Sequence, residues 1–220
     1  MTKYCAVPGC QEQADGYSTK CGSHKTRERR HGDAQQKPVT ARELRPYVAR
    51  IEKRVKANPD SPAWIVLDAR WGRIVDGSRA VLAARERGEA GNMHEWLAAS
   101  EVIKLEETEG SRRVAAVALA MSAFWLEHKH RFTTAKAYQF QLVRRVRGQS
   151  AVNRGVSWDH KRQQTRTVYR EMPPKATELL AAWLDAAYSS AGVQLAMMEE
   201  EARTREATTL EAAIQALRLP

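Results

Sequence analysis

The sequence predicts a mainly α-helical fold, with a small cysteine-containing module at the N-terminus and a short β wing near residues 150–172. Apolar side chains recur at helical spacing through most of the chain after residue 40. The three cysteines all lie within the first 21 residues. Strand character, from β-branched and aromatic residues, is confined to the stretch 165–172. With 220 residues, 43% of them hydrophobic, the chain can bury one core of ordinary size or two small ones.

The N-terminal module is predicted over residues 1–34. Its cysteines and one histidine have the spacing of a zinc knuckle, with four candidate ligands: Cys5, Cys10, Cys21 and His24. Zinc favours a tetrahedron of thiolates and imidazoles, and two short-spaced pairs let two tight turns deliver all four ligands. Three thiolates and one imidazole leave no position for water, so we expect a structural Zn²⁺ and not a catalytic one.

Residues 1–33 resemble a short zinc-binding segment of phage and mobile-element proteins, including some HNH homing endonucleases. In that segment a Cys/Cys/Cys/His set runs into an Arg-rich turn that ends in Gly-Asp. Lys25 and Glu28 depart from the pattern, which usually has aromatic residues there. The resemblance implies that the module contacts nucleic acid. The matching residues are Cys5, Cys10, Cys21, His24, Arg27, Arg30, Gly32 and Asp33.

A linker over residues 35–39 is predicted to lead into the first helix of the body. Thr40 and Glu43 have the spacing of a capping box, and one apolar face continues to about Lys56. Pro46 weakens the first turns and leaves a later start open.

Four further helical sections are predicted from caps and apolar spacing. One long stripe follows Ser61-Pro62, with a break at Asp76-Gly77 as an alternative. The others run from Asn92 to about Gly110, from Ser111 to about His128, and from Thr133 or Thr134 to Gly148.

The C-terminal part is predicted as a loop, a wing and a last helical section. Residues 149–161 read as a loop, and 165–172 as a strand that could belong to a two-stranded wing. Pro173-Pro174 begins the last section, which we expect to be interrupted near Gly192, with a short terminal helix capped by Thr208. The predicted units are therefore a basic helical domain, 40–172, and an acidic helical section, 173–220.

The positive charge is segregated along the chain. The net charge is +10, and the basic residues gather in two stretches, 20–56 and 129–170. Such stretches gain counterion-release free energy on a phosphate backbone, so nucleic acid is the expected partner. For Arg144, Arg145 and Arg147 a role at the negative end of a helix is an equal alternative. The predicted nucleic-acid contacts are Lys25, Arg27, Arg29, Arg30, His31, Arg144, Arg145, Arg147, Arg154, Lys161, Arg162, Arg166 and Arg170.

Enzyme chemistry is not expected. Asp159-His160 could open an HNH nuclease motif, but no Asn and no His follows residue 160 to complete it. The set His128, Arg131, His160 and Tyr169 resembles the end of a tyrosine recombinase site, yet Arg112 lies too close to His128 for that scaffold. No Gly-rich phosphate loop is present.

These observations lead to two hypotheses. The first is a zinc-stabilised DNA-binding accessory or regulatory protein of a phage or mobile genetic element, with RNA as an alternative ligand. The second is an adaptor that docks onto a recombinase, a nuclease or a phage structural component. The longest apolar run, Val114 to Leu126, is too short to cross a bilayer, and no signal-peptide pattern opens the chain. We therefore expect a cytoplasmic location and no membrane partner.

Overall fold

Helices make up most of the protein in the computed structural model, which describes residues 3–150 and 153–216. The mainly α fold class is thus confirmed, and a two-stranded hairpin, β1–β2, forms the predicted wing. In chain order the elements are α1 (Gly22–His31), α2 (Ala41–Ala57), α3 (Pro62–Glu86), α4 (Met93–Thr108), α5 (Gly110–Glu127), the 3-10 turn η1 (Lys129–Arg131), α6 (Ala135–Arg147), β1 (Arg154–Asp159), β2 (Gln164–Tyr169) and α7 (Pro174–Ala216).

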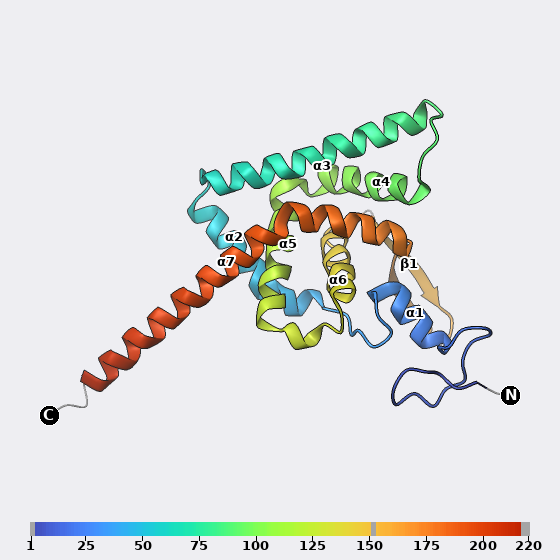
Figure 1. The fold of residues 1–220 in the computed structure, drawn as a ribbon, viewed down its shortest axis with the longest axis horizontal. Coiled ribbons are helices and arrows are strands. Elements are labelled where there is room, and N and C mark those ends of the chain that lie inside the picture. The colour runs from blue at the N-terminus through green and yellow to red at the C-terminus, as the bar shows by residue number, and fades with distance from the viewer. Residues whose placement is uncertain (1–2, 151–152, 217–220) are drawn as a thin grey trace.

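Helix α5 lies at the centre of the body (Figure 1). Every residue from Val114 to Phe124 is buried, because α2, α3, α4, α6 and α7 contact it from different sides. A helix that is apolar all round can be stable only in such an interior position. Alanines supply much of this surface, and their small side chains let the neighbouring helices approach closely.

The predicted helix starts are confirmed where a side-chain cap is present. Thr40 and Glu43 form the complete capping box of α2, and Asn92 and Thr134 cap α4 and α6. Helix α2 begins at Ala41 and continues through Pro46, so the later start is wrong. Helix α3 likewise has no break at Asp76-Gly77.

The C-terminal section is one helix, α7, and not the two pieces expected. Gly192 does not interrupt it; a Cβ atom at this position would lie 2.4 Å from Oγ of Ser122 on α5. The glycine therefore serves close helix packing. Thr208 is not a cap, since its Oγ1 donates to the carbonyl of Thr204 inside the continuing helix. The last turns of α7 extend beyond the body, and their side chains are exposed from Glu201 onward (Figure 1).

The prediction of a loop over residues 149–161 is also wrong in part, because β1 occupies Arg154–Asp159. This strand pairs antiparallel with β2, in a register that places Trp158 opposite Thr165 and Asp159 opposite Gln164. The side chains of Arg154 and of residues 166–169 lie outside the described part of the structure.

The expected linker, 35–39, is packed against the body. The Gln36 side chain is fully buried, donates to the Arg131 carbonyl over 3.1 Å, and accepts from the Thr133 amide over 3.2 Å. The N-terminal module nevertheless has its own small core, which is separate from the large one. Helix α7 packs into the same large core as α5. The predicted boundary at residue 172, where the chain changes from basic to acidic, therefore does not divide the core in two. No described helix is long and apolar enough to span a membrane.

Candidate metal centre and arginine cleft

The four predicted zinc ligands come together at the N-terminal module. Their ligand atoms, three Sγ and one imidazole nitrogen, all lie within 4.8 Å of one another. Nδ1 of His24 is 3.2 Å from Sγ of Cys21 and 3.4 Å from Sγ of Cys5. Sγ of Cys10 and of Cys21 are 3.9 Å apart. A zinc tetrahedron with bonds of about 2.3 Å to sulfur and about 2.1 Å to nitrogen has edges of about 3.5–3.8 Å. The donor set therefore fits one metal ion.

Local turns deliver these ligands. The amide of Cys10 donates to the carbonyl of Val7 over 3.1 Å, which closes a tight turn that includes Gly9 at a φ of 76°. Cys21 is the N-cap residue of α1, and His24 lies in the first turn of this helix. The first pair of ligands thus comes from a knuckle and the second from a helix start.

The pKa values of the Cys5 and Cys10 thiols are shifted in opposite directions. Burial alone would raise the pKa of Cys5, but hydrogen bonds with the backbone of Cys21 and Val7 and with His24 bring it down to about 6. A backbone hydrogen bond with Glu12 lowers the pKa of Cys10, yet burial and the neighbouring Cys5 and Cys21 raise it more. A divalent cation would remove this conflict, because it stabilises all three thiolates together.

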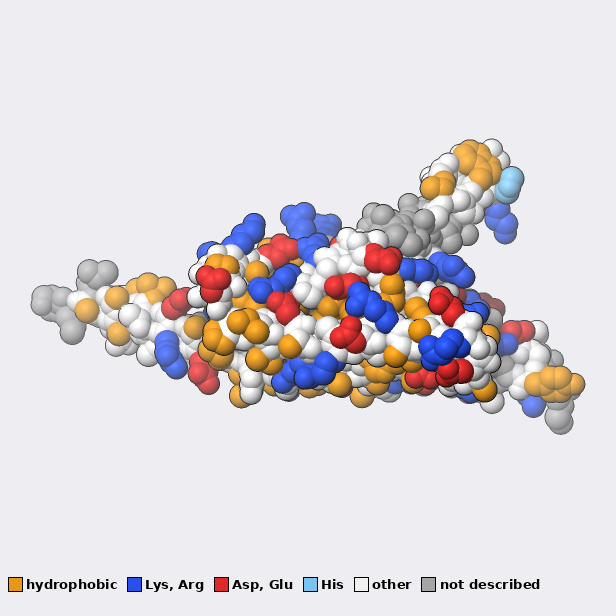
Figure 2. Space-filling view, turned by 90° about the horizontal axis from the view of Figure 1, so that it is seen from above, with side chains coloured by type: hydrophobic (Ala, Val, Ile, Leu, Met, Phe, Trp, Pro, Cys, Tyr) orange, Lys and Arg blue, Asp and Glu red, His pale blue; other side chains and the backbone are white. Residues whose placement is uncertain are grey.

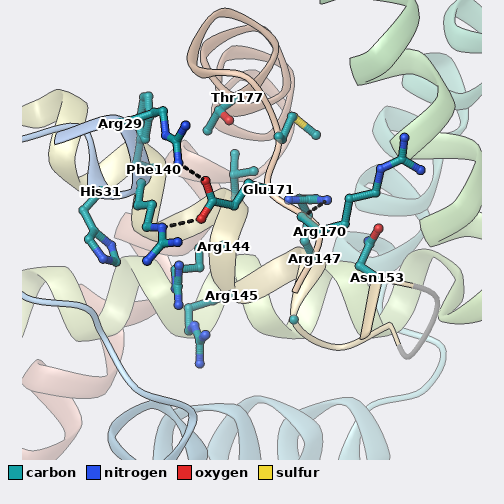
Figure 3. Close-up of a pocket in the computed structure, with 14 residues that line it drawn as sticks. Arg29, His31, Phe140, Arg144, Arg145, Arg147, Asn153, Arg170, Glu171 and Thr177 are labelled. Carbon is teal, nitrogen blue, oxygen red and sulfur yellow. Dashed lines mark hydrogen bonds and ion pairs between the residues drawn. The ribbon is translucent and has the colours of Figure 1, made fainter. Parts of the chain in front are cut away.

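A cleft of about 290 Å³ lies where α1, α6, the foot of the hairpin and the segment before α7 meet (Figure 3). It brings together arginines from the two basic stretches, and Arg30 and Arg144 in it are more than a hundred residues apart in the sequence. Glu171 is the one acid among its described lining residues. Seven predicted nucleic-acid contacts line it: Arg29, Arg30, His31, Arg144, Arg145, Arg147 and Arg170.

Glu171 connects the N-terminal module to the body. Its carboxylate accepts from Arg29 over 2.7 Å and from Arg30, both in the last turn of α1. All three side chains are partly exposed, so these ion pairs are accessible to water and to competing anions. Sequence reasoning missed Glu171. The available signal was a carboxylate directly after Arg170, where the basic stretch ends.

Arg147 does not serve as a free phosphate contact, contrary to expectation. Its side chain is 13% exposed and forms an ion pair of 2.9 Å with Glu101, whose side chain is 5% exposed. Glu101 also accepts from Asn153, and Arg147 donates to the Arg170 carbonyl over 3.0 Å. The role of Arg147 is therefore to fix the base of the hairpin to α4 and α6. Arg147 also lies in the last turn of α6, the position on which the predicted helix-end role depends.

His31 lines the cleft but is buried, so little of its side chain is open to the predicted groove contact. Nε2 of Gln141, itself fully buried, lies 3.1 Å from Nδ1 of His31. Burial, followed by the positive charge of Arg144 and Arg30, lowers the pKa of His31 to about 4, and the ring is neutral at pH 7. The next residue, Gly32, has a φ of 81°, and a Cβ there would lie 2.8 Å from the Lys136 carbonyl. Both residues pack α1 tightly against α6.

The remaining predicted contacts lie outside the cleft. Lys25 pairs with Asp15 over 2.9 Å, whereas Arg27 is exposed and has no ion pair with any described residue. Lys161 and Arg162 are exposed in the turn of the hairpin. Arg154 and Arg166 lie in the strands, and their side chains are outside the described ones.

The groups of the tyrosine recombinase comparison have separate partners. His128 contacts the Tyr47 hydroxyl over 3.0 Å, and Arg131 pairs with Glu43 over 2.5 Å. Arg112 pairs with Asp68 over 2.8 Å. The side chain of Tyr169 is not among those described. No protein-family model, curated protein or solved structure matches the chain.

Proposed function

We propose that this chain is a zinc-stabilised, non-enzymatic DNA-binding protein, an accessory or regulatory factor of a phage or other mobile element. The observation that carries the proposal is the cleft, where arginines of α1, α6 and the foot of the hairpin lie around Glu171, the one acid among the described lining residues. The resemblance of residues 1–33 to mobile-element zinc segments supports the biological setting. Three reduced thiols favour the cytoplasm as the location.

Arginine is the side chain best suited to such a cleft. Its planar guanidinium can donate two hydrogen bonds to one phosphate, and it stays charged at every physiological pH. Neutralising several phosphates releases condensed counterions, which supplies most of the affinity for a nucleic-acid backbone. Contacts of this kind position a strand without reading its sequence.

The metal would not contact the nucleic acid itself but would position residues that do. Zinc held by Cys5, Cys10, Cys21 and His24 would fix the small core of the module and the start of α1. The last turn of the same helix carries Arg29 and Arg30 into the cleft. The ion therefore contributes to binding by holding these two arginines in place.

The test is the double variant Arg29→Gln/Arg30→Gln. Loss of two phosphate contacts is expected to weaken binding of an oligonucleotide about tenfold at 0.1 M salt and to reduce the salt slope by about 1–2. The matched control is Arg79→Gln/Arg87→Gln on the outer end of α3, since both residues also pair with acids but lie away from the cleft. Equal affinity of the two double variants for DNA would refute the proposal. Competition with duplex, single-stranded and RNA oligonucleotides identifies the preferred ligand.

A second candidate function, a protein-interaction adaptor, is favoured by the free end of α7. Residues 201–216 are exposed, and Leu210 and Ile214 carry apolar surface there. Its partner would be a recombinase, a nuclease or a phage structural component. A largely apolar interface would hold its affinity as salt rises, whereas phosphate binding would not.

A further inference from the structure

The hairpin β1–β2 rises from the rim of the arginine cleft. Asn153 and Arg170, at its two feet, both line the cleft, and the amide of Arg170 donates to the Asn153 carbonyl over 3.0 Å. From there the strands project away from the helical body as an arm (Figure 2). Six residues per strand at about 3.3 Å each give an arm of about 20 Å.

One face of this arm carries unusual apolar surface. The side chains of Val156 and Trp158 are 78% and 48% exposed, and residues two apart in a strand lie on the same face. Trp64 and Trp71 are buried, and the other three tryptophans are half-buried. Trp158 is thus the exposed tryptophan of the chain. Thr165, which pairs with it across the hairpin, is also exposed, and about half of the Trp158 surface is open to solvent.

The turn at the tip of the arm carries two cations, and hydrophobic side chains lie beside them at its outer end (Figure 2). Lys161 and Arg162 lie in a four-residue turn between the strands, and both their amides donate to Oδ1 of Asp159, at 3.1 and 3.2 Å. An apolar wedge that separates stacked base pairs would need to stand at such a tip. Here the tip offers charge to phosphates, and the aromatic face stands beside it on the flank of the ribbon.

We propose that Trp158 is a stacking platform for an unpaired nucleobase of a strand whose phosphates lie in the arginine cleft. This inference rests on the proposed function and narrows its ligand to single-stranded nucleic acid, DNA or RNA. An indole stacks on the face of any base, and that face is free only when the base has left a duplex. Cations at the tip and in the cleft hold the backbone on both sides of the stacked base.

The test compares Trp158→Ala, Trp158→Phe and the control Ile65→Ala, which removes a similarly exposed apolar side chain from α3. Binding of a fluorescent 20-nucleotide strand and of the matching duplex is followed by anisotropy. Trp158→Ala is expected to weaken single-strand binding about tenfold and to leave duplex binding within about twofold. Trp158→Phe is expected to keep most of the affinity. The salt slope is expected to stay unchanged, because no charge is lost.

The outcomes separate this inference from the proposed function. The stacking role would be overturned if Trp158→Ala bound the single strand as tightly as the wild type does, or if it lost equal affinity for strand and duplex. In either case, salt-dependent binding by the wild type would still support the cleft as a nucleic-acid site. An effect of Trp158→Ala on a protein partner but not on any oligonucleotide would assign the face to protein docking and overturn the inference. Absence of wild-type binding to strand, duplex and RNA would overturn both.

Discussion

Replacement of Glu171 by glutamine is expected to strengthen nucleic-acid binding. The carboxylate accepts hydrogen bonds from Arg29 and Arg30, and it is the one acid among the described residues that line the cleft. A phosphate that enters must compete with Glu171 for both guanidinium groups. Glutamine keeps the size of the side chain and removes its negative charge, so this competition weakens.

The magnitude follows from the exposure of the two ion pairs. Their side chains are 37–56% exposed, and pairs of that kind stabilise a protein by about 0.2–1 kcal/mol each. Removal of both competing interactions therefore lowers the free energy of binding by about 1 kcal/mol, which corresponds to about a fivefold gain in affinity. The same change makes two more cations available to phosphates, so the salt slope is expected to become steeper by about 1–2.

Anisotropy titrations of one labelled oligonucleotide at several salt concentrations measure both quantities. Glu89→Gln is the matched control, because Glu89 also pairs with an arginine, Arg87, over 2.7 Å but lies away from the cleft. Zinc content and thermal unfolding of each variant are measured alongside. Weaker binding by Glu171→Gln, at unchanged zinc content and stability, would show that Glu171 orients the two arginines for the ligand and would refute the competition described here.

Three further predictions concern the metal, the foot of the hairpin and acid stability. Chelation or Cys10→Ala is expected to remove one bound Zn²⁺ and unfold residues 3–34 while the far-UV helix signal largely persists; an unchanged N-terminal NMR spectrum would contradict the site. Arg147→Ala is expected to lower the free energy of unfolding by about 3 kcal/mol in urea titrations, because it leaves Glu101 buried without its closest cation. A loss of DNA affinity without a loss of stability would show instead that Arg147 contacts phosphates. His31 has a pKa of about 4 in the folded state against 6.5 otherwise, so the unfolded chain takes up the proton first. The contribution of neutral His31 to the free energy of unfolding is therefore complete above about pH 6.5 and falls by up to about 1.4 kcal/mol per pH unit toward pH 4. His31→Asn is expected to flatten the plot of unfolding free energy against pH in that range.

Sequence reasoning succeeded where local chemistry decides the structure. The capping box at Thr40, the caps at Asn92 and Thr134, and the spacing within each pair of candidate metal ligands depend on residues a few positions apart. It failed where a distant contact overrides a local signal. Gly192 signals a helix break, but in the fold it lets α7 pass Ser122 on α5. Strand β1 has little strand character of its own and depends on its pairing with β2.

The candidate site shows the same division between local and distant effects. Charge patterning identified the arginines of both basic stretches. It did not predict that these stretches meet, since Glu171 is 142 residues from Arg29. Charge patterning also did not distinguish Arg147 from the other arginines of the cleft. Only the fold shows that a buried carboxylate on α4 holds Arg147 in place. His31 follows the arginines directly in sequence, yet the end of α1 turns its ring inward against Gln141.

The salt dependence of single-strand binding by the zinc-loaded wild type tests the central claim most directly. Without Arg147, which pairs with Glu101, five arginines and one carboxylate give the cleft a net charge of about +4. About four phosphate contacts predict a slope of about −2.8 for log affinity against log salt, which is a loss of about fiftyfold between 50 and 200 mM. A slope near zero, or no binding at 50 mM, would contradict the claim that this cleft binds a nucleic-acid backbone.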